Sequence, residues 1–187
     1  MVLLGIMGPI GSGKSTVANH LVKKHGFVEK SFAEPLKKAC QELFLFTNDQ
    51  MFGTQDQKMT PDERWFGCSP RTALQFVGTE LLRDNLNTIM PGLGKNIFTH
   101  HFTIWYLNEI AKNPDIKVVV SDVRFQNEVN VIHSLGGSVI KITRDMTTTS
   151  THASEVDMQS IMNFDHQVLN TSSLDNLYEL VDTIVFY

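Results

Sequence analysis

The chain has 187 residues, 42% of them apolar and 19% charged, and this balance fits a single domain with a buried core. The formal charge of −4 gives no basic excess for binding DNA, although a small phosphorylated ligand needs only local positive charge. Because we find no transmembrane-length apolar run, no basic signal-peptide start and no metal-like spacing of Cys40 and Cys68, we expect an intracellular, cytoplasmic protein with reduced thiols and neither membrane nor nucleic-acid contacts.

The first half of the chain alternates between predicted strands and helices. The apolar run Val2–Met7 predicts a strand, and a helix over about 14–25 should end at Gly26. A second strand is expected over 27–33. Pro35 then opens a helix as a first-turn residue. Apolar residues recur along this helix at amphipathic spacing, at Leu36, Ala39, Cys40, Leu43 and Phe44.

The rest of the chain continues this alternation after an irregular interruption. Residues 47–68 are polar and predict an irregular region. Ser69 and Pro70 then restart a helix, as cap and first-turn residue, that should reach about Asp84. The later predictions are a helix over 101–112, a strand at Ile116–Val120, a helix over 125–135, strands over 138–143 and 166–170, and a closing helix marked by Leu174, Leu177, Tyr178 and Val181. This order predicts an α/β fold with a parallel sheet, helices on both faces and ligands at the carboxyl ends of the strands.

One motif indicates the class of ligand. The segment GPIGSGKS, Gly8 to Ser15, fits the phosphate-loop pattern G-x-x-x-x-G-K-[ST], with a strand before it and a helix beginning inside it. The backbone N–H groups of such a loop point at phosphates, and the helix start adds partial positive charge. Lys14 should reach the β- and γ-phosphates of ATP, and Ser15 should ligate Mg²⁺. The other loop residues expected to bind ATP are Gly8, Ile10, Gly11, Ser12, Gly13 and Thr16. The motif predicts a three-layer P-loop NTPase fold.

A carboxylate on a neighbouring strand is also expected. P-loop enzymes use such an acid to hold the metal through its water shell, and Asp122 directly follows the apolar strand and Ser121. Asp122 could instead cap a helix or pair with Arg124. The metal-linked role is the one that the phosphate loop favours.

The positive side chains favour phosphoryl transfer over a GTPase switch. Neither the guanine-reading N-K-x-D segment nor a strand-ending D-x-x-G is present. Guanidinium groups bind phosphates bidentately and stay charged, so they suit a reaction between two anions. We expect the five arginines near the ligand end of the sheet: Arg64, Arg71, Arg83, Arg124 and Arg144.

The helix predicted over 69–84 carries a polar face. At helical spacing Arg71, Gln75 and Thr79 lie together, opposite an apolar side made of Ala73, Leu74, Val77 and Leu81. Gly78 lies between the two faces. Glycine in mid-helix costs about 1 kcal/mol relative to alanine, so we expect either a ligand or close packing beside it. A solvated helix face is the alternative interpretation of the polar stripe.

Five segments together resemble one family, the deoxynucleoside monophosphate kinases of bacteriophages and other DNA viruses: GPIGSGKST, SFAEPLK, SPRTALQFVGTELLRD, VVSDVRFQNE and HASE. The resemblance covers about residues 2–175. It implies a nucleoside monophosphate kinase-like fold, ATP and Mg²⁺ on the donor side, a deoxynucleoside monophosphate as acceptor, and often a homodimer. It also implies one P-loop kinase domain over 1–187, with an acceptor-side mobile region over about 47–68.

The resemblance implies roles for individual residues. The acceptor site would be lined by Lys37, Arg71, Gln75 and Arg83. Arg124 would meet the phosphates in transfer, and Arg144 would act from a lid-like region over about 144–156. Glu155 would orient the acceptor, and Asn170 would approach the adenine of ATP. The predicted lid has a single arginine, whereas many monophosphate kinases have several there.

Other readings remain open. The start of the chain also resembles dephospho-CoA kinase, and PLK with SDVR resembles animal phosphomevalonate kinase. Dephospho-CoA kinases usually carry D-A-D where KSFAEP stands, and the phosphomevalonate enzymes usually have two adjacent arginines where Phe125 follows Arg124. A nucleotide-binding switch without transfer is a rival of another class. We favour ATP-dependent phosphorylation of deoxynucleoside monophosphates.

Overall fold

The computed structural model describes residues 2–144 and 161–186. Two compact units make up the chain, one formed by Met1–Phe32 with Phe102–Tyr187 and the other by Ala33–His101. In the described ranges, no helix combines the length and the apolar character that crossing a membrane requires.

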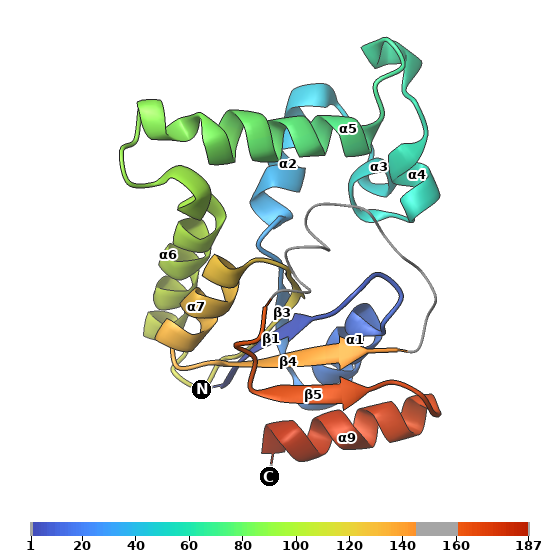
Figure 1. Ribbon diagram of the computed structural model, residues 1–187, viewed down its shortest axis with the longest axis vertical. Coiled ribbons are helices and arrows are strands. Elements are labelled where there is room, and N and C mark those ends of the chain that lie inside the picture. Colours follow the sequence, from blue (N-terminus) through green and yellow to red (C-terminus); the bar gives the residue numbers. More distant parts are fainter. Residues whose placement is uncertain (1, 145–160, 187) are drawn as a thin grey trace. The chain divides into compact units, whose positions relative to one another are not determined.

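The first unit contains a five-stranded parallel sheet in the order β2-β3-β1-β4-β5 (Figure 1). Its strands are β1 (Val2–Met7), β2 (Val28–Lys30), β3 (Lys117–Val123), β4 (Ser138–Thr143) and β5 (His166–Leu169). The parallel sheet confirms the predicted fold class. β1 and β4 match their expected ranges, while β2 is shorter than the predicted strand over 27–33.

Helices cover both faces of this sheet. The helices concerned are α1 (Lys14–His25), α7 (Gln126–Ser134), α9 (Leu174–Phe186) and α6 (Ile97–Lys112), which begins in the second unit and ends in the first. Leu4 and Ile6 of β1 share a buried cluster with residues of α1 and α9. On the opposite face, a Cβ at Gly5 would lie 2.5 Å from Cδ1 of Ile132 in α7, so the glycine permits this close approach. The three-layer prediction is therefore confirmed for this unit.

The order of the strands positions a ligand site. After β1 the chain crosses one face through α1 to reach β2, and after β3 it crosses the other face through α7 to reach β4 (Figure 1). The topological switch point therefore lies between the carboxyl ends of β1 and β3. Open α/β sheets bind ligands in the crevice at such a point.

β3 contains a bulge that the sequence did not reveal. Gly5 pairs with Val120 but Met7 pairs with Val123, so β3 has one residue more than β1 between these pairs. The predicted strand ended at Val120, whereas the observed strand continues to Val123 because Ser121 and Asp122 are accommodated in the bulge.

The second unit is helical. It contains α2 (Glu34–Phe44), α3 (Asn48–Phe52), α4 (Gln55–Met59) and α5 (Pro70–Gln75), together with the shorter or wider helical segments η1 (Glu63–Trp65), η2 (Phe76–Asp84), η3 (Leu86–Thr88) and η4 (Gly94–Asn96). The prediction of an irregular region over 47–68 is wrong in this respect. Thr47 and Thr54 each begin a short helix with a complete capping box, formed with Gln50 and Gln57.

The helix predicted over 69–84 exists, but its geometry changes along its length. Ser69 caps it by accepting a hydrogen bond from Thr72 N–H, at 3.2 Å. From Phe76 onward the backbone hydrogen bonds widen to the π-helical pattern, i→i+5. The buried residues Ala73 and Gly78 are five positions apart, as the wider π-helical turn requires. Leu81, which α-helical spacing placed on the apolar face, is 47% exposed. The apolar face predicted from α-helical spacing therefore does not persist beyond Gln75.

Candidate active site

The phosphate loop follows β1 and leads directly into α1. Gly8 and Gly13 have φ angles of 148° and 110°, which side chains other than glycine rarely adopt. A Cβ at Gly8 would also meet the carbonyl oxygen of Ile142 and, at 2.8 Å, the hydroxyl of Ser12. The first hydrogen bond of α1 runs from Val17 N–H to the Gly13 carbonyl, at 3.0 Å, so the preceding N–H groups of the helix have no intrahelical acceptor. These groups provide the donors and the partial positive charge that an anion requires.

The side chains of the loop differ in exposure. Ser12 is buried, and its hydroxyl has no hydrogen-bond partner within the described part of the chain. Ser15 is exposed and Thr16 is half-buried in the first turn of α1. Ile10 is 44% exposed at the tip of the loop. The orphaned Ser12 hydroxyl and the exposed Ser15 hydroxyl both fit a site that binds a polar ligand.

Lys14 lies across the start of the loop. Its ammonium donates hydrogen bonds to the carbonyl oxygens of Gly8, at 2.6 Å, and Pro9, at 2.7 Å. These carbonyls hold the cation beside the backbone donors of the loop. Phosphate oxygens could exchange for them as acceptors.

Asn170, which follows β5, supports the loop from outside. Its side-chain amide donates to the Ser12 carbonyl at 2.9 Å, and its backbone N–H donates to the Thr143 carbonyl at 2.7 Å. The side chain is buried, and its Nδ2 atom lies 2.8 Å from where a Cβ at Gly13 would stand. This positioning role was missed in the sequence. The expected approach of Asn170 to adenine stays a prediction.

Asp122 joins the ends of β3 and β2. One carboxylate oxygen accepts a hydrogen bond from the Ser31 hydroxyl and the other from the Phe32 backbone N–H, both at 2.8 Å. Ser121, the other residue of the bulge, donates a hydrogen bond to the carboxylate of Glu29 in β2 at 2.6 Å, so both bulge residues bond to β2 or to the residues directly after it. The two bonds of Asp122, to Ser31 and Phe32, are neither a helix cap nor an ion pair with Arg124, the two alternatives that the sequence left open.

Arg124 directly follows Val123, the last residue of β3, which pairs with Met7 of β1. Its backbone N–H and that of Phe125 donate to the buried carboxylate of Glu128, at 2.8 and 3.1 Å. Glu128 therefore fixes the backbone from which the half-buried Arg124 side chain extends. Because Gly8 follows Met7, this arginine and the phosphate loop leave neighbouring strands at the switch point.

The other donor-side prediction concerns the segment after β4. Arg144 is exposed and directly follows Thr143, the last residue of that strand. It therefore stands at the same edge of the sheet as Gly8 and Arg124. Glu155 and the rest of the lid-like range beyond Arg144 lie outside the described residues.

The predicted acceptor-side residues belong to the second unit. The Lys37 ammonium lies 5.3 Å from the centre of the Phe52 ring, and the Arg83 guanidinium lies 5.1 Å from that of Phe98. Arg71 is half-buried and Gln75 is exposed one turn later on α5. All four predicted residues are thus placed on helices of this unit.

The mid-helix glycine has a packing explanation. Gly78 is buried, and a Cβ there would lie 2.6 Å from Cδ2 of Leu36 in α2. Of the two reasons that the sequence allowed for Gly78, close packing is the one that the structure supports. The glycine lets α2 and η2 approach each other.

Arg64, one of the five arginines expected near the ligand end of the sheet, belongs to the second unit and has a structural partner there. Its guanidinium donates to both carboxylate oxygens of Asp62, at 3.0 and 2.6 Å, and the Gln50 amide donates to one of them at 2.8 Å. Asp62 is buried, and its backbone N–H bonds the Cys68 carbonyl at 3.2 Å. This arginine therefore stabilises the turn over 62–68.

Sequence comparison identifies the family. Residues 46–181 match the sequence model described as deoxynucleotide monophosphate kinase. A protein of Acanthamoeba polyphaga mimivirus, named "Putative deoxynucleotide monophosphate kinase", is 55% identical over 186 residues, which cover 99% of this chain and 96% of the relative. The chain belongs to the deoxynucleotide monophosphate kinase family.

The solved structures that align with this chain share far less of its sequence. A dephospho-CoA kinase from Campylobacter jejuni is 16% identical, with a TM-score of 0.46 over 97% of this kinase and 95% of that chain. The protein TT1252 from Thermus thermophilus is 16% identical, with a TM-score of 0.49 over 98% and 95%. As a member of its family, this kinase is a phosphotransferase that acts on nucleotides.

Proposed function

We propose that this kinase transfers the γ-phosphoryl group of ATP to the 5′-phosphate of a deoxynucleoside monophosphate, with Mg²⁺. The observation that carries the proposal is the phosphate loop at the switch point of the sheet, with Arg124 leaving the adjacent strand. Membership of the deoxynucleotide monophosphate kinase family supports the choice of acceptor.

The donor side of the proposal rests on the loop itself. Lys14, the first N–H groups of α1 and the glycines at positive φ form a cationic, backbone-lined surface suited to a triphosphate. Ser15 would bind Mg²⁺ through its exposed hydroxyl, and Asp122 would hold it through water. Bound there, Mg²⁺ would offset negative charge on the β- and γ-phosphates.

The acceptor phosphate is already a nucleophile, so the chemistry needs no strong general base. The work of the protein is to position two anions in line and to stabilise the charge that develops between them. Arg124 is suited to this role because its backbone is fixed by Glu128 and its guanidinium has no hydrogen-bond or ion-pair partner among the residues that the structure describes. Arg144 would add charge from the end of β4.

Substrate assays test the reaction directly. Purified kinase is incubated with Mg²⁺-ATP and, in turn, deoxynucleoside monophosphates, ribonucleoside monophosphates, dephospho-CoA and phosphomevalonate. The proposal expects ADP formation that depends on a deoxynucleoside monophosphate. Turnover only with dephospho-CoA or phosphomevalonate would support one of those two kinase activities instead. ADP release at the same rate with and without an acceptor would support a nucleotide-binding switch.

Two adjacent lysines of α2 provide a matched test of the acceptor side. Lys37 is half-buried against Phe52, whereas Lys38 is exposed and pairs with Glu34 at 2.6 Å. Lys37→Ala should raise the acceptor KM about tenfold or more, about 1.4 kcal/mol, with little change in the KM for ATP. Lys38→Ala should change neither value. Equal losses for both substrates in the first variant would contradict an acceptor-side role.

Two further expectations stay predictions. A cytoplasmic location fits the thiols of Cys40 and Cys68, which are both free. Assembly as a homodimer follows from the family resemblance alone, and sedimentation of the purified kinase would test it.

A further inference from the structure

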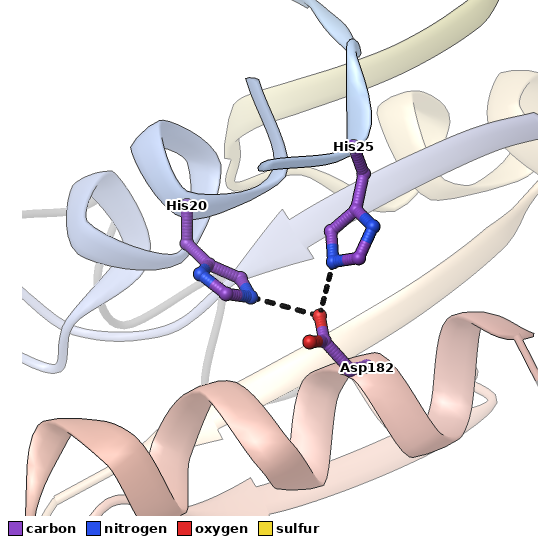
Figure 2. A group of neighbouring side chains, drawn as sticks. All are labelled: His20, His25 and Asp182. Carbon is purple, nitrogen blue, oxygen red and sulfur yellow. Dashed lines mark hydrogen bonds and ion pairs between the residues drawn. The ribbon is translucent and has the colours of Figure 1, made fainter. Parts of the chain in front are cut away.

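A second group of polar side chains joins α1 to α9 (Figure 2). The Nε2 atoms of His20 and His25 each lie 2.8 Å from the same carboxylate oxygen, Oδ1 of Asp182. The three potential ligand atoms lie within 4.8 Å of one another. Among residues 2–144 and 161–186, this is the one group of three such side chains close enough to hold a metal ion.

The two imidazole rings are held in place by packing. The ring of His20 stacks on Tyr178 of α9, with centroids 4.1 Å apart and planes 2° apart. The ring of His25 packs against Phe186 at 4.4 Å, and the backbone carbonyl of His25 accepts a hydrogen bond from Lys117 at 3.3 Å. The side chains of His20 and His25 are only 8% and 18% exposed, so both nitrogens are presented to Asp182 by largely buried rings.

We propose that His20, His25 and Asp182 form a structural binding site for a borderline divalent cation of the Zn²⁺ type. Two imidazole nitrogens and one carboxylate oxygen are ligands that Zn²⁺ and its neighbours prefer, whereas Mg²⁺ prefers oxygen ligands. In a neutral imidazole that carries its proton on Nδ1, the lone pair of Nε2 is available to bind a metal ion. Both histidines can therefore act as ligands in their neutral form. Water would complete the four-coordinate shell.

The surroundings leave room for water and supply further negative charge. A cavity of about 430 Å³ opens beside the group and is lined by both His20 and Asp182. Asp175 and Glu179 of α9 also line it, and their carboxylates would attract a cation to the opening. The ion would link α9 to α1, the helix whose first turn carries Lys14 and Ser15.

One neighbour opposes the cation. The Lys24 ammonium donates to the other oxygen of Asp182 at 2.8 Å, and its side chain is 60% exposed. Because it can move into solvent, it does not block the site, but its charge weakens the attraction for a cation. Removal of this charge should therefore strengthen binding, which is the opposite of what removal of a ligand would do.

Calorimetric titration of the full-length, nucleotide-free protein tests the site. Zn²⁺ and, separately, Co²⁺ are titrated in the presence of excess Mg²⁺, and we expect one equivalent to bind. His25→Gln and Asp182→Asn should each weaken binding at least about tenfold, since even changes next to metal ligands cost 10–100-fold. Lys24→Ala should tighten it. Both ligand replacements keep polar groups that can hydrogen-bond, and circular dichroism checks that they fold.

The chain offers a matched control in another histidine–aspartate pair. His133 bonds Asp165 at 2.9 Å and, within the ranges 2–144 and 161–186, belongs to no group of three, so His133→Gln should bind Zn²⁺ as the unaltered protein does. Zn²⁺ should also raise the Tm of the unaltered protein but not that of Asp182→Asn. Absence of binding, or equal affinity in the ligand and control variants, would overturn the proposal. Neither readout depends on kinase activity, so the two proposals fail independently.

Discussion

The side-chain amide of Asn170 donates a hydrogen bond to the backbone carbonyl of Ser12, at 2.9 Å, so the residue after the last strand holds the phosphate loop. Both residues are buried. A loop that must present its N–H groups to phosphates gains from such support, because fixed donors need no reorganisation when charge develops. The bond therefore links the far end of the sequence to the donor site.

Asn170→Ala should weaken ATP binding while leaving the sheet intact. The buried Ser12 carbonyl would lose its donor, which costs about 1–3 kcal/mol, and the loop would lose its fixed position. We expect the KM for ATP to rise about tenfold, about 1.4 kcal/mol, with a smaller change in the acceptor KM. Gln167→Ala, at an exposed amide of the preceding strand β5, is the control and should match the unaltered enzyme. Equal kinetics for both variants would refute the supporting role.

Lys14→Ala should abolish transfer without unfolding the protein. The ammonium bonds the carbonyls of Gly8 and Pro9 in its own loop, and the residue is half-buried and does not belong to the buried core. Loss of one group that stabilises developing charge costs about 10²–10³ in rate, and we expect kcat to fall at least that far. Lys23→Ala, at an exposed position of α1, is the matched control. Substantial kcat in the Lys14 variant would exclude the proposed donor site.

Patterns within single segments of the sequence predicted most of the strands and the parallel sheet that they form. The apolar runs of β1 and β4, the stop at Gly26 and the phosphate loop all depend on local sequence, and the structure has them where they were expected. The parallel sheet then followed from the alternation of strands and helices. The carboxyl-edge positions of Arg124 and Arg144 followed as well.

Features that depend on tertiary partners were missed. Nothing local in the sequence marks the extra residue of β3, because a bulge is defined by the register with β1. The π-helical turns after Gln75 likewise change which residues share a face. In contrast, the T-x-x-Q patterns that begin α3 at Thr47 and α4 at Thr54 are local capping boxes, and such a pattern predicts the start of a helix from sequence alone.

Gly78→Val should destabilise the second unit by overpacking it. The added side chain would enter space that Leu36 occupies, and such insertions cost about 1–3 kcal/mol. Combining it with Leu36→Ala should recover part of this loss, so the two effects on the free energy of unfolding would not be additive. Denaturant titrations of the single and double variants measure this coupling. Strictly additive losses would argue against packing as the reason for the glycine.

Acid should weaken the second unit through Asp62. The hydrogen bond from the Arg64 guanidinium, helped by that from Gln50, holds the pKa of Asp62 well below its ordinary value of 3.8. A carboxyl whose pKa is lower in the folded state stabilises the fold above its unfolded pKa, about 3.9, and this contribution is lost as the pH falls through that value toward the folded pKa.

Asp62→Asn removes this linkage. The variant should have a lower Tm than the unaltered protein at about pH 7, and its Tm should fall less between about pH 6 and about pH 3, because no proton is taken up at this position. Asp115→Asn, at an exposed aspartate between α6 and β3, is the control and should keep the full acid sensitivity. Thermal unfolding followed by circular dichroism across this range measures both. An Asp62 variant that loses as much Tm in acid as the control would show that the Arg64 pair does not govern acid stability.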